Sequence, residues 1–311
     1  MKRILLFFGA LLLGAGAIMM FALSRHKVDD WPDVLVTNFA AYDLARAAAG
    51  DDVRIEMLLK PGAELHDYEP TAEDLVKIRH ASLLIYNGGE SEAWMDEILS
   101  KSLVYGQVRT FGLMQVVELK EEETVEGMES EEGEDEAEAE YDEHVWTSPR
   151  NMIAMLDVTA EQMRLAGIAV DEAKLADYRE KLVAVDNELR DVADGSAHKE
   201  LIFGDRFPFR YFVDEFGLKY YAAFPGCADK TEANSATVAF LIQKVREDEV
   251  PVILKTELSA GVVAEAIARE TGAKVMEFHS AHNISREDFE AGVTYVDLMR
   301  RNLAVLREAL R

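Results

Sequence analysis

The alternation of short apolar runs with amphipathic segments is the feature that most constrains the fold of this chain. Strands are predicted at residues 33–38, 52–59, 82–89, 200–204, 218–224, 251–257 and 273–278. Helices are predicted between and after them, at residues 40–50, 71–81, 92–102, 149–168, 237–249, 261–272 and 288–311. Strands that alternate with helices form parallel sheets from βαβ units. The pattern occurs in two series, which predicts an α/β protein with two lobes.

A long amphipathic segment, residues 171–195, lies between the two series. Its apolar side chains recur every third or fourth residue, at Leu175, Tyr178, Leu182, Val185 and Leu189. This spacing predicts one helix that links an N-terminal lobe, residues 28–170, to a C-terminal lobe, residues 196–311. A chain of 311 residues, 49% of them hydrophobic, is long enough to form two cores.

The N-terminus has the pattern of a membrane or export segment. Residues 4–23 carry no charge and follow the basic start Met-Lys-Arg. Twenty helical residues span about 30 Å, the thickness of a bilayer's hydrocarbon core. A lipoprotein would carry a cysteine near the end of this segment, where Ser24 stands. We therefore expect residues 1–27 to be an uncleaved anchor, with the rest outside the cytoplasm; cleavage, giving a secreted or periplasmic protein, is the alternative.

The charge of the chain is strongly acidic, with 59 acidic and 33 basic residues and a net charge of -26. This balance argues against a nucleic-acid partner, because phosphates require Lys and Arg. Residues 121–143 contain many of the acidic side chains and no basic one. Such a segment buries little apolar surface and is predicted to be a disordered loop. It is either a solvated tract or a weak collector of cations.

The chain has seven histidines, and four of them occupy positions typical of ligand-binding residues. His66 follows a predicted strand and a Pro-Gly turn, and His144 lies between the acidic tract and a helix. His279 and His282 follow the predicted strand 273–278. Parallel sheets bind ligands at the carboxyl ends of their strands.

The remaining histidines and the single cysteine have simpler interpretations. His26, His80 and His198 are interpreted as structural. Cys227 is alone, so neither a disulfide within the chain nor a cysteine-based zinc motif is possible. The zinc-protease pattern His-Glu-x-x-His is absent. Imidazole ligands favour zinc, whereas sites rich in carboxylates favour manganese or calcium.

Three motifs resemble the substrate-binding proteins of zinc and manganese ABC transporters. They are PGAELHDYEPTAED (61–74), DEHVWTSPRN (142–151) and FGLKYYAAF (216–224). The resemblance covers roughly residues 33–311. It implies two α/β lobes joined by one rigid helix, with the metal bound between the lobes. It also implies an extracytoplasmic, monomeric receptor that captures Zn²⁺, or less readily Mn²⁺, for a membrane permease and has no enzymatic activity.

The resemblance implies a metal site at His66, His144, His279 and His282. His66 and His144 match the first and second ligands of the family. The third-ligand position holds Arg206, which has no lone pair to donate. The fourth falls on His279, and His282 could supply what Arg206 cannot. Asp205 and Cys227 are the other candidates to complete the site, and Trp146 and Tyr68 are expected to shield it.

Two other functions are compatible with the sequence. A zinc hydrolase would use three histidines, an open water position and a general base, either Glu69 or Asp205. A surface adhesion or scaffold protein would use the anchor but would leave the placement of the histidines unexplained.

Overall fold

The computed structural model describes residues 31–63, 68–100, 108–128, 140–226 and 233–311. The predicted anchor, residues 1–27, and the predicted site residues His66 and Cys227 lie outside these ranges. In the ranges that the structure describes, no helix has the length and apolar character needed to cross a membrane. Residues 32–311 form one compact unit, to which the following description applies.

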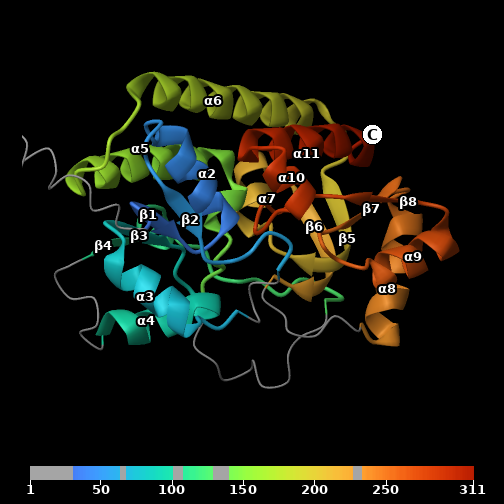
Figure 1. The fold of residues 1–311 in the computed structure, drawn as a ribbon. Helices are drawn as coiled ribbons and strands as arrows, with labels where there is room; N and C mark the ends of the chain where they lie inside the picture. Colours follow the sequence, from blue (N-terminus) through green and yellow to red (C-terminus); the bar gives the residue numbers. More distant parts are fainter. Residues whose placement is uncertain (1–30, 64–67, 101–107, 129–139, 227–232) are drawn as a thin grey trace, which may run out of the picture. The chain divides into compact units, whose positions relative to one another are not determined.

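The first sheet has the strand order β2-β1-β3-β4, and all its strands are parallel. Its strands are β1 (Val34–Val36), β2 (Ile55–Met57), β3 (Leu83–Tyr86) and β4 (Arg109–Gly112). The helices of this part are α2 (Phe39–Ala48), α3 (Ala72–His80), α4 (Ala93–Ser100) and α5 (Pro149–Leu165) (Figure 1). The helix predicted at 71–81 is confirmed as α3. It begins after Thr71, because the Thr71 and Asp74 side chains cap each other's backbone amides. Strand β4 was not predicted, because its sequence Arg-Thr-Phe-Gly is short and half polar.

The second sheet has the order β6-β5-β7-β8 and is also parallel throughout. Its strands are β5 (Glu200–Phe207), β6 (Lys219–Pro225), β7 (Val252–Lys255) and β8 (Lys274–Glu277). The helices α7 (Arg210–Phe216), α8 (Ser235–Glu247) and α9 (Val262–Thr271) accompany it. At Gly204 the sheet and α9 approach so closely that a Cβ atom would lie 2.4 Å from the Ala264 Cα atom. Two parallel sheets flanked by helices confirm the predicted fold class.

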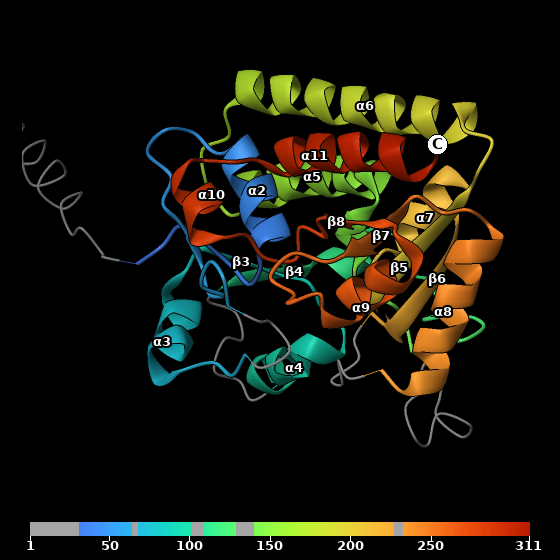
Figure 2. The ribbon, with the colours of Figure 1, turned by 90° about the vertical axis from the view of Figure 1, so that its right-hand side faces the viewer.

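Helix α6 (Glu172–Gly195) lies between the two sheets in the chain and packs against α5 and α11 (Tyr295–Ala309). Figures 1 and 2 both show it running along the outer side of these two helices. Four of the five apolar side chains in the predicted stripe are buried, and Leu175 is half-buried. The Tyr178 hydroxyl donates to the buried Asp43 carboxylate of α2, whose other oxygen pairs with Arg46. Helix α6 is therefore fixed to α2 by a polar contact as well as by apolar packing.

The single final helix predicted at residues 288–311 is wrong. The structure has two helices, α10 (Arg286–Glu290) and α11, with a turn between them. Gly292 adopts a φ of 73° in this turn, a conformation that favours glycine. Thr294 then starts α11 with a reciprocal cap from Asp297. The amphipathic pattern continues across this segment and predicts one helix, but the glycine turn and the threonine cap divide it into two.

The prediction of a disordered loop over all of residues 121–143 is wrong at both ends. Glu121 and Tyr141 form an antiparallel bridge, and the Glu122 amide donates to the Glu140 carbonyl at 2.8 Å. Near the start of the segment Met128 is buried in the core, and at its end Asp142 is buried. Local charge did not prevent order here, because backbone pairing and a few buried side chains fix the two ends. Residues 129–139 lie outside the described ranges.

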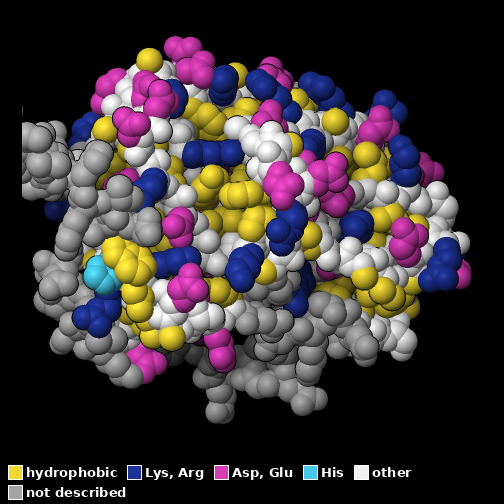
Figure 3. Space-filling model, viewed as in Figure 1, with side chains coloured by type: hydrophobic (Ala, Val, Ile, Leu, Met, Phe, Trp, Pro, Cys, Tyr) yellow, Lys and Arg dark blue, Asp and Glu magenta, His cyan; other side chains and the backbone are white. Residues whose placement is uncertain are grey.

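The surface in Figure 3 carries acidic and basic side chains interspersed, including those of α6 at the upper edge. Charged side chains of the protein also form ion pairs between segments, such as Arg164 with Glu172 and Arg301 with Asp288. Paired charges of both signs are typical of a solvated surface, and exposed pairs contribute about 0–1 kcal/mol each.

Candidate metal-binding site

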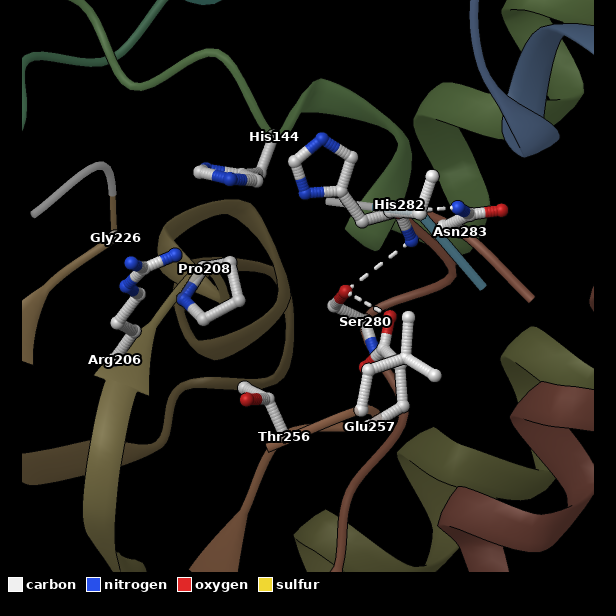
Figure 4. A pocket seen from close by; sticks show the side chains of 11 residues that line it. His144, Arg206, Pro208, Gly226, Thr256, Glu257, Ser280, His282 and Asn283 are labelled. Atoms are coloured by element: carbon white, nitrogen blue, oxygen red, sulfur yellow. Dashed lines mark hydrogen bonds between the residues drawn. The ribbon is translucent and has the colours of Figure 1, made fainter. Parts of the chain in front are cut away.

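A small cavity of about 50 Å³ lies where the carboxyl ends of the second sheet meet the segment before α5. Its lining includes His144, Arg206, Thr256, Glu257, Ser280 and His282. Figure 4 shows the imidazole rings of His144 and His282 side by side and nearly perpendicular, with the Arg206 side chain reaching toward His144 from the end of β5. The cavity is thus built from segments that are far apart in the sequence and end at one edge of a parallel sheet, as expected for an α/β binding site.

His144 is buried and is held by Asp142. One oxygen of the Asp142 carboxylate accepts from the backbone N–H of His144 at 2.8 Å and lies 3.2 Å from the ring Nδ1. This contact favours a proton on Nδ1, which leaves the lone pair of Nε2 for a metal. Nε2 is buried and has no hydrogen-bond partner in the part of the chain that the structure describes. His144 lines the cavity, so a nitrogen with a free lone pair on this ring can serve as a metal ligand there.

The electrostatic surroundings of His144 are negative. Burial alone would lower the pKa of His144, but the charge and hydrogen bond of Asp142, together with Glu143 and Glu122, raise the pKa above its usual value. Acidic neighbours that stabilise a protonated imidazole also stabilise a metal cation at the same place. The ends of the acidic tract therefore contribute negative charge around His144, although their side chains do not line the cavity.

His282 lies opposite His144, at a ring-centroid distance of 5.4 Å. Trp146 packs against both rings, at 5.4 Å from His144 and 5.2 Å from His282. Its indole Nε1 donates to the Ser280 carbonyl at 2.9 Å and so joins the segment before α5 to the loop after β8. Trp146 is fully buried and covers one side of the histidine pair. Tyr68 instead packs against Trp94, at a ring distance of 5.7 Å.

Glu257 holds the loop that carries His282. Its carboxylate accepts from the Ser280 amide at 2.7 Å and from the Ser280 hydroxyl at 2.6 Å. The same hydroxyl oxygen accepts from the His282 amide at 3.2 Å (Figure 4). Glu257 was not predicted as a site residue, although it stands two residues after β7, at the same sheet edge as the histidines. Its position after a buried strand is the signal that could have identified it.

His279 occupies a different position from His282 and is not among the residues that line the cavity. Its side chain is buried, its Nδ1 accepts from the Ala281 amide at 2.9 Å, and this nitrogen lies 3.6 Å from Glu257. Its backbone amide and carbonyl both bond to the Asn302 side chain of α11. Ala281, between the two histidines, takes a φ of 60°, in the left-handed region that non-glycine residues seldom adopt. The bonds to Asn302 connect the loop after β8 to α11 through the backbone of His279.

The other candidate ligands are placed as follows. Arg206 lines the cavity from the end of β5. The neighbouring Asp205 is buried, and its carboxylate accepts from the Thr256 amide at 3.1 Å and from the Arg206 amide at 2.9 Å. In the residues that the structure describes, no three His, Cys, Asp or Glu side chains are gathered closely enough to hold a metal ion. His66 and Cys227 lie outside those residues.

The segment just before residue 64 lies against the loop that carries His282. The Asn283 side-chain amide donates to the Lys60 carbonyl at 2.9 Å and to the Ala63 carbonyl at 2.5 Å. The Gly62 amide donates to the Ile284 carbonyl at 2.8 Å, and Ala63 lines the cavity itself. Three hydrogen bonds thus attach the chain preceding position 64 to the wall of the cavity.

Gly226 supports the His144 ring by leaving space beside it. A Cβ atom at this position would lie 3.0 Å from the Phe207 carbonyl oxygen and 3.2 Å from Cε1 of His144. Gly226→Ala is expected to displace the ring by a few tenths of an ångström and to weaken metal binding about 10-fold, as supporting residues around metal sites do. Gly195→Ala is the control, because a Cβ atom there meets nothing within 4 Å. Equal zinc affinity of the two variants, measured by titration, would contradict this role.

Two parallel α/β sheets with a histidine-lined cavity at one sheet edge define the class of two-lobed solute-binding proteins. The chain belongs to the family described as zinc-uptake complex component A, periplasmic, whose family model matches residues 34–309. The family assignment confirms the resemblance seen in the sequence.

Curated relatives and solved structures agree with this assignment. The chain is similar to the zinc-binding lipoprotein AdcA of Streptococcus pneumoniae, with 29% identity over 99% of this chain and 61% of AdcA. It thus spans about three fifths of that relative's length. It is also 29% identical to the high-affinity zinc uptake system protein ZnuA of Bacillus subtilis, over 92% of this chain and 90% of ZnuA. The solved structure of the metal-dependent lipoprotein YcdH of Bacillus subtilis matches at a TM-score of 0.74, with 27% identity over 89% of this chain and 99% of that one.

Proposed function

We propose that this protein is the extracytoplasmic substrate-binding component of a metal ABC transporter, which captures Zn²⁺ and delivers it to a membrane permease. The observation that carries the proposal is the meeting of His144 and His282 in one cavity, with the buried Nε2 of His144 lacking a hydrogen-bond partner among the described residues. Neutral imidazoles favour zinc over manganese, since manganese prefers oxygen ligands. The names of AdcA and ZnuA as zinc proteins support the same metal.

Of the four histidines predicted from the sequence, we propose that His66, His144 and His282 contact the metal. The hydrogen bonds from Gly62 and Asn283 support His66, since they attach the chain just before it to the cavity wall. The fourth histidine, His279, positions the loop from outside the cavity through Asn302 and Ala281. Three imidazoles leave one position of a tetrahedral zinc ion without a histidine.

The proposed activity is binding and release, without bond chemistry. A hydrolase would require a general base close to a metal-bound water. Glu69 is exposed, and the Asp205 carboxylate is engaged by the amides of Arg206 and Thr256. Neither carboxylate lines the histidine cavity. A receptor therefore accounts for the arrangement better than an enzyme.

The domain organisation and location belong to the same proposal. Residues 28–170 and 196–311 would act as two lobes joined by α6, and residues 1–27 would attach the receptor to the membrane or direct its export. The name of AdcA as a lipoprotein supports an extracytoplasmic location. The partner is the transporter's permease, and we propose that the receptor acts as a monomer.

Calorimetric titration of the full chain with zinc tests this proposal. We expect one tight site in the wild type and an affinity loss of about 100-fold in His282→Ala, because four ligands share roughly 10–16 kcal/mol and each accounts for about 3 kcal/mol. His279→Ala is expected to lose about 10-fold, because it removes loop support and not a donor. Absence of tight binding in the wild type would reject the transport function. Equal losses in the two variants would instead make His279 a direct ligand.

A further inference from the structure

We propose that Leu258 is the gate of the metal cavity, and that its apolar side chain sets the rate at which zinc enters and leaves. The inference rests on the proposed function and goes beyond it, because it concerns how fast the metal exchanges and not which residues hold it. It is carried by the place of Leu258 on the wall shared by two cavities, by its exposure and by its backbone conformation.

A second cavity, of about 240 Å³, adjoins the histidine cavity. The two cavities share four lining residues, and Leu258 is the only apolar one among them; the others are Arg206, Thr256 and Glu257. Figure 4 shows Thr256 and Glu257, the two residues before Leu258, below the histidines. The larger cavity therefore provides a route toward the histidines that passes the Leu258 side chain.

The volumes of the two cavities indicate where the metal loses its water. A hydrated divalent cation carries about six waters, which need roughly 60–90 Å³ at about 10–15 Å³ each. The larger cavity, of about 240 Å³, has room for the hydrated ion, whereas the histidine cavity, of about 50 Å³, does not. An ion that takes this route exchanges water for imidazole nitrogens as it passes Leu258.

The charged groups of the larger cavity suit a cation in transit. Its ionisable lining residues are Asp205, Arg206 and Glu257, so that carboxylates outnumber the guanidinium. A cleft with an excess of one charge raises the local concentration of the opposite ion. Among the described residues no three His, Cys, Asp or Glu side chains are gathered closely enough to hold a metal. The larger cavity is therefore suited to passage and not to tight binding.

The exposure of Leu258 is the second observation. Half of its side chain is accessible to solvent, with an exposed fraction of 50%. Burial of this apolar surface would be favourable, yet the residue lies open on the wall of both cavities. Apolar groups around a metal site limit the access of water to it. Leu258 is placed to do this at the boundary between the hydrated ion and the histidines.

The backbone of Leu258 is the third observation. Its φ of 61° lies in the left-handed region that residues with a side chain seldom adopt. Hydrogen bonds hold the loop on both sides of this position. Before it, the Thr256 amide and hydroxyl donate to Asp205 at 3.1 and 3.2 Å. After it, the Lys255 ammonium donates to the Ser259 carbonyl at 2.9 Å. Strain that the surroundings maintain in this way is typical of functional positions, and here it keeps an apolar side chain on the cavity wall.

The test is the rate of zinc exchange with the full chain, measured by stopped flow at fixed pH. Release is followed by mixing the zinc-loaded protein with an excess of a fluorescent zinc chelator. Capture is followed by mixing the metal-free protein with zinc on a weak indicator, which releases it faster than the protein takes it up. In Leu258→Gly we expect both rates to rise about 10-fold, which corresponds to a barrier lower by about 1.4 kcal/mol. The affinity, which is the ratio of the two rates, is expected to change less than about 3-fold, because the metal-binding side chains remain.

Two further variants separate the gate from a structural role. Leu258→Met, which stays apolar and similar in size, is expected to keep the wild-type rates. Val262→Ala is the matched control, because Val262 is also exposed and apolar but lines the larger cavity and not the histidine cavity. Its rates should equal those of the wild type.

The thermal stability of the metal-free protein gives an independent readout. Glycine adopts the left-handed conformation without penalty, so Leu258→Gly should melt no earlier than the wild type. Loss of a structural contact would instead lower the melting temperature.

Three results would overturn the inference. Exchange rates of Leu258→Gly equal to those of the wild type would place the route of the metal elsewhere. Faster release with unchanged capture would make Leu258 part of the binding site and not its gate. An equal acceleration in Val262→Ala would show that the rates do not depend on position 258. Failure of the wild type to take up zinc would instead reject the proposed function, so the two failures are distinguishable.

Discussion

The double variant His144→Ala, His282→Ala is expected to lose zinc affinity by about four orders of magnitude. Four ligands of a zinc site share roughly 10–16 kcal/mol, so each contributes about 3 kcal/mol and two contribute about 6 kcal/mol. Each 1.4 kcal/mol is a factor of ten in affinity, which gives the expected loss. The measurement is zinc competition with a chelator of known affinity, at neutral pH and constant ionic strength.

The double variant has a matched control that retains the same number of histidines. His80 and His198 are both exposed, on α3 and in the turn before β5. The variant His80→Ala, His198→Ala is therefore expected to keep wild-type affinity. Circular dichroism and thermal melting of both double variants show whether the fold is retained. A loss of less than 10-fold in the first variant, with its fold intact, would remove His144 and His282 from the site.

The ranking of the histidines shows how far the sequence could predict the site. His144 precedes α5 and His282 follows β8, and both elements were predicted from the apolar pattern of the sequence. Because parallel strands end at one edge of a sheet, residues that follow them were expected to form a binding site. Our proposal of His282 and not His279 as a ligand depends on the turn at Ala281 and on the bonds between His279 and Asn302, which lies 23 residues away. Hydrogen bonds between residues so far apart cannot be predicted from local periodicity. The sequence therefore offered no reason to prefer one of the two histidines as a ligand.

The fold was predictable for similar reasons, and its errors are local. Helix α6 was found because its apolar side chains repeat over many turns, and α3 because Thr71 caps it. Strand β4 was missed because an edge strand of four residues carries little apolar signal. The predicted last helix is two helices, because Gly292 forms a turn and Thr294 caps the start of α11. The two ends of the acidic tract are ordered, because Glu121 and Tyr141 form a backbone bridge. In the last helix and in the acidic tract, a specific dihedral angle or hydrogen bond outweighed the average character of the segment.

The ordered end of the acidic tract also changes its functional interpretation. Asp142 holds His144 in orientation, and Glu143 accepts from the amide of Ser91 at 3.2 Å. The Glu143 carbonyl in turn accepts from the Asn87 side chain at 2.9 Å. The segment that carries His144 is therefore attached to the loop after β3. That loop depends on one buried carboxyl group, Glu92.

Glu92 holds the loop after β3 through its side chain. One oxygen accepts from the Asn87 amide at 2.7 Å and from the Gly88 amide at 2.9 Å. Burial raises the pKa of Glu92 to about 7, although hydrogen bonding from Thr37 and from the Gly88 and Asn87 amides lowers it, and the nearby Glu143 charge adds to the rise. The folded protein therefore favours a neutral carboxyl group at this position.

The stability of the metal-free protein should consequently fall as pH rises. In the unfolded chain Glu92 loses its proton near its ordinary pKa of 4.5, but in the folded protein only near 7. Between these values the folded state binds more protons, so the free energy of unfolding decreases with pH and levels off above about 7. One pKa unit corresponds to about 1.4 kcal/mol, so the full cost is roughly 3 kcal/mol.

Glu92→Gln is expected to remove this cost, because the amide oxygen can accept the same two N–H donors and carries no charge. The variant should match the wild type near pH 5 and exceed it by up to about 3 kcal/mol at pH 8. Urea denaturation across this range measures the difference, with a chelator present because bound zinc would add its own pH dependence. Glu90→Gln, an exposed change in the same turn, should follow the wild type at every pH. A difference between Glu92→Gln and the wild type that stays constant from pH 5 to 8 would show that Glu92 is ionised in the folded protein. The loop beside His144 would then be held by a charge and not by a neutral group.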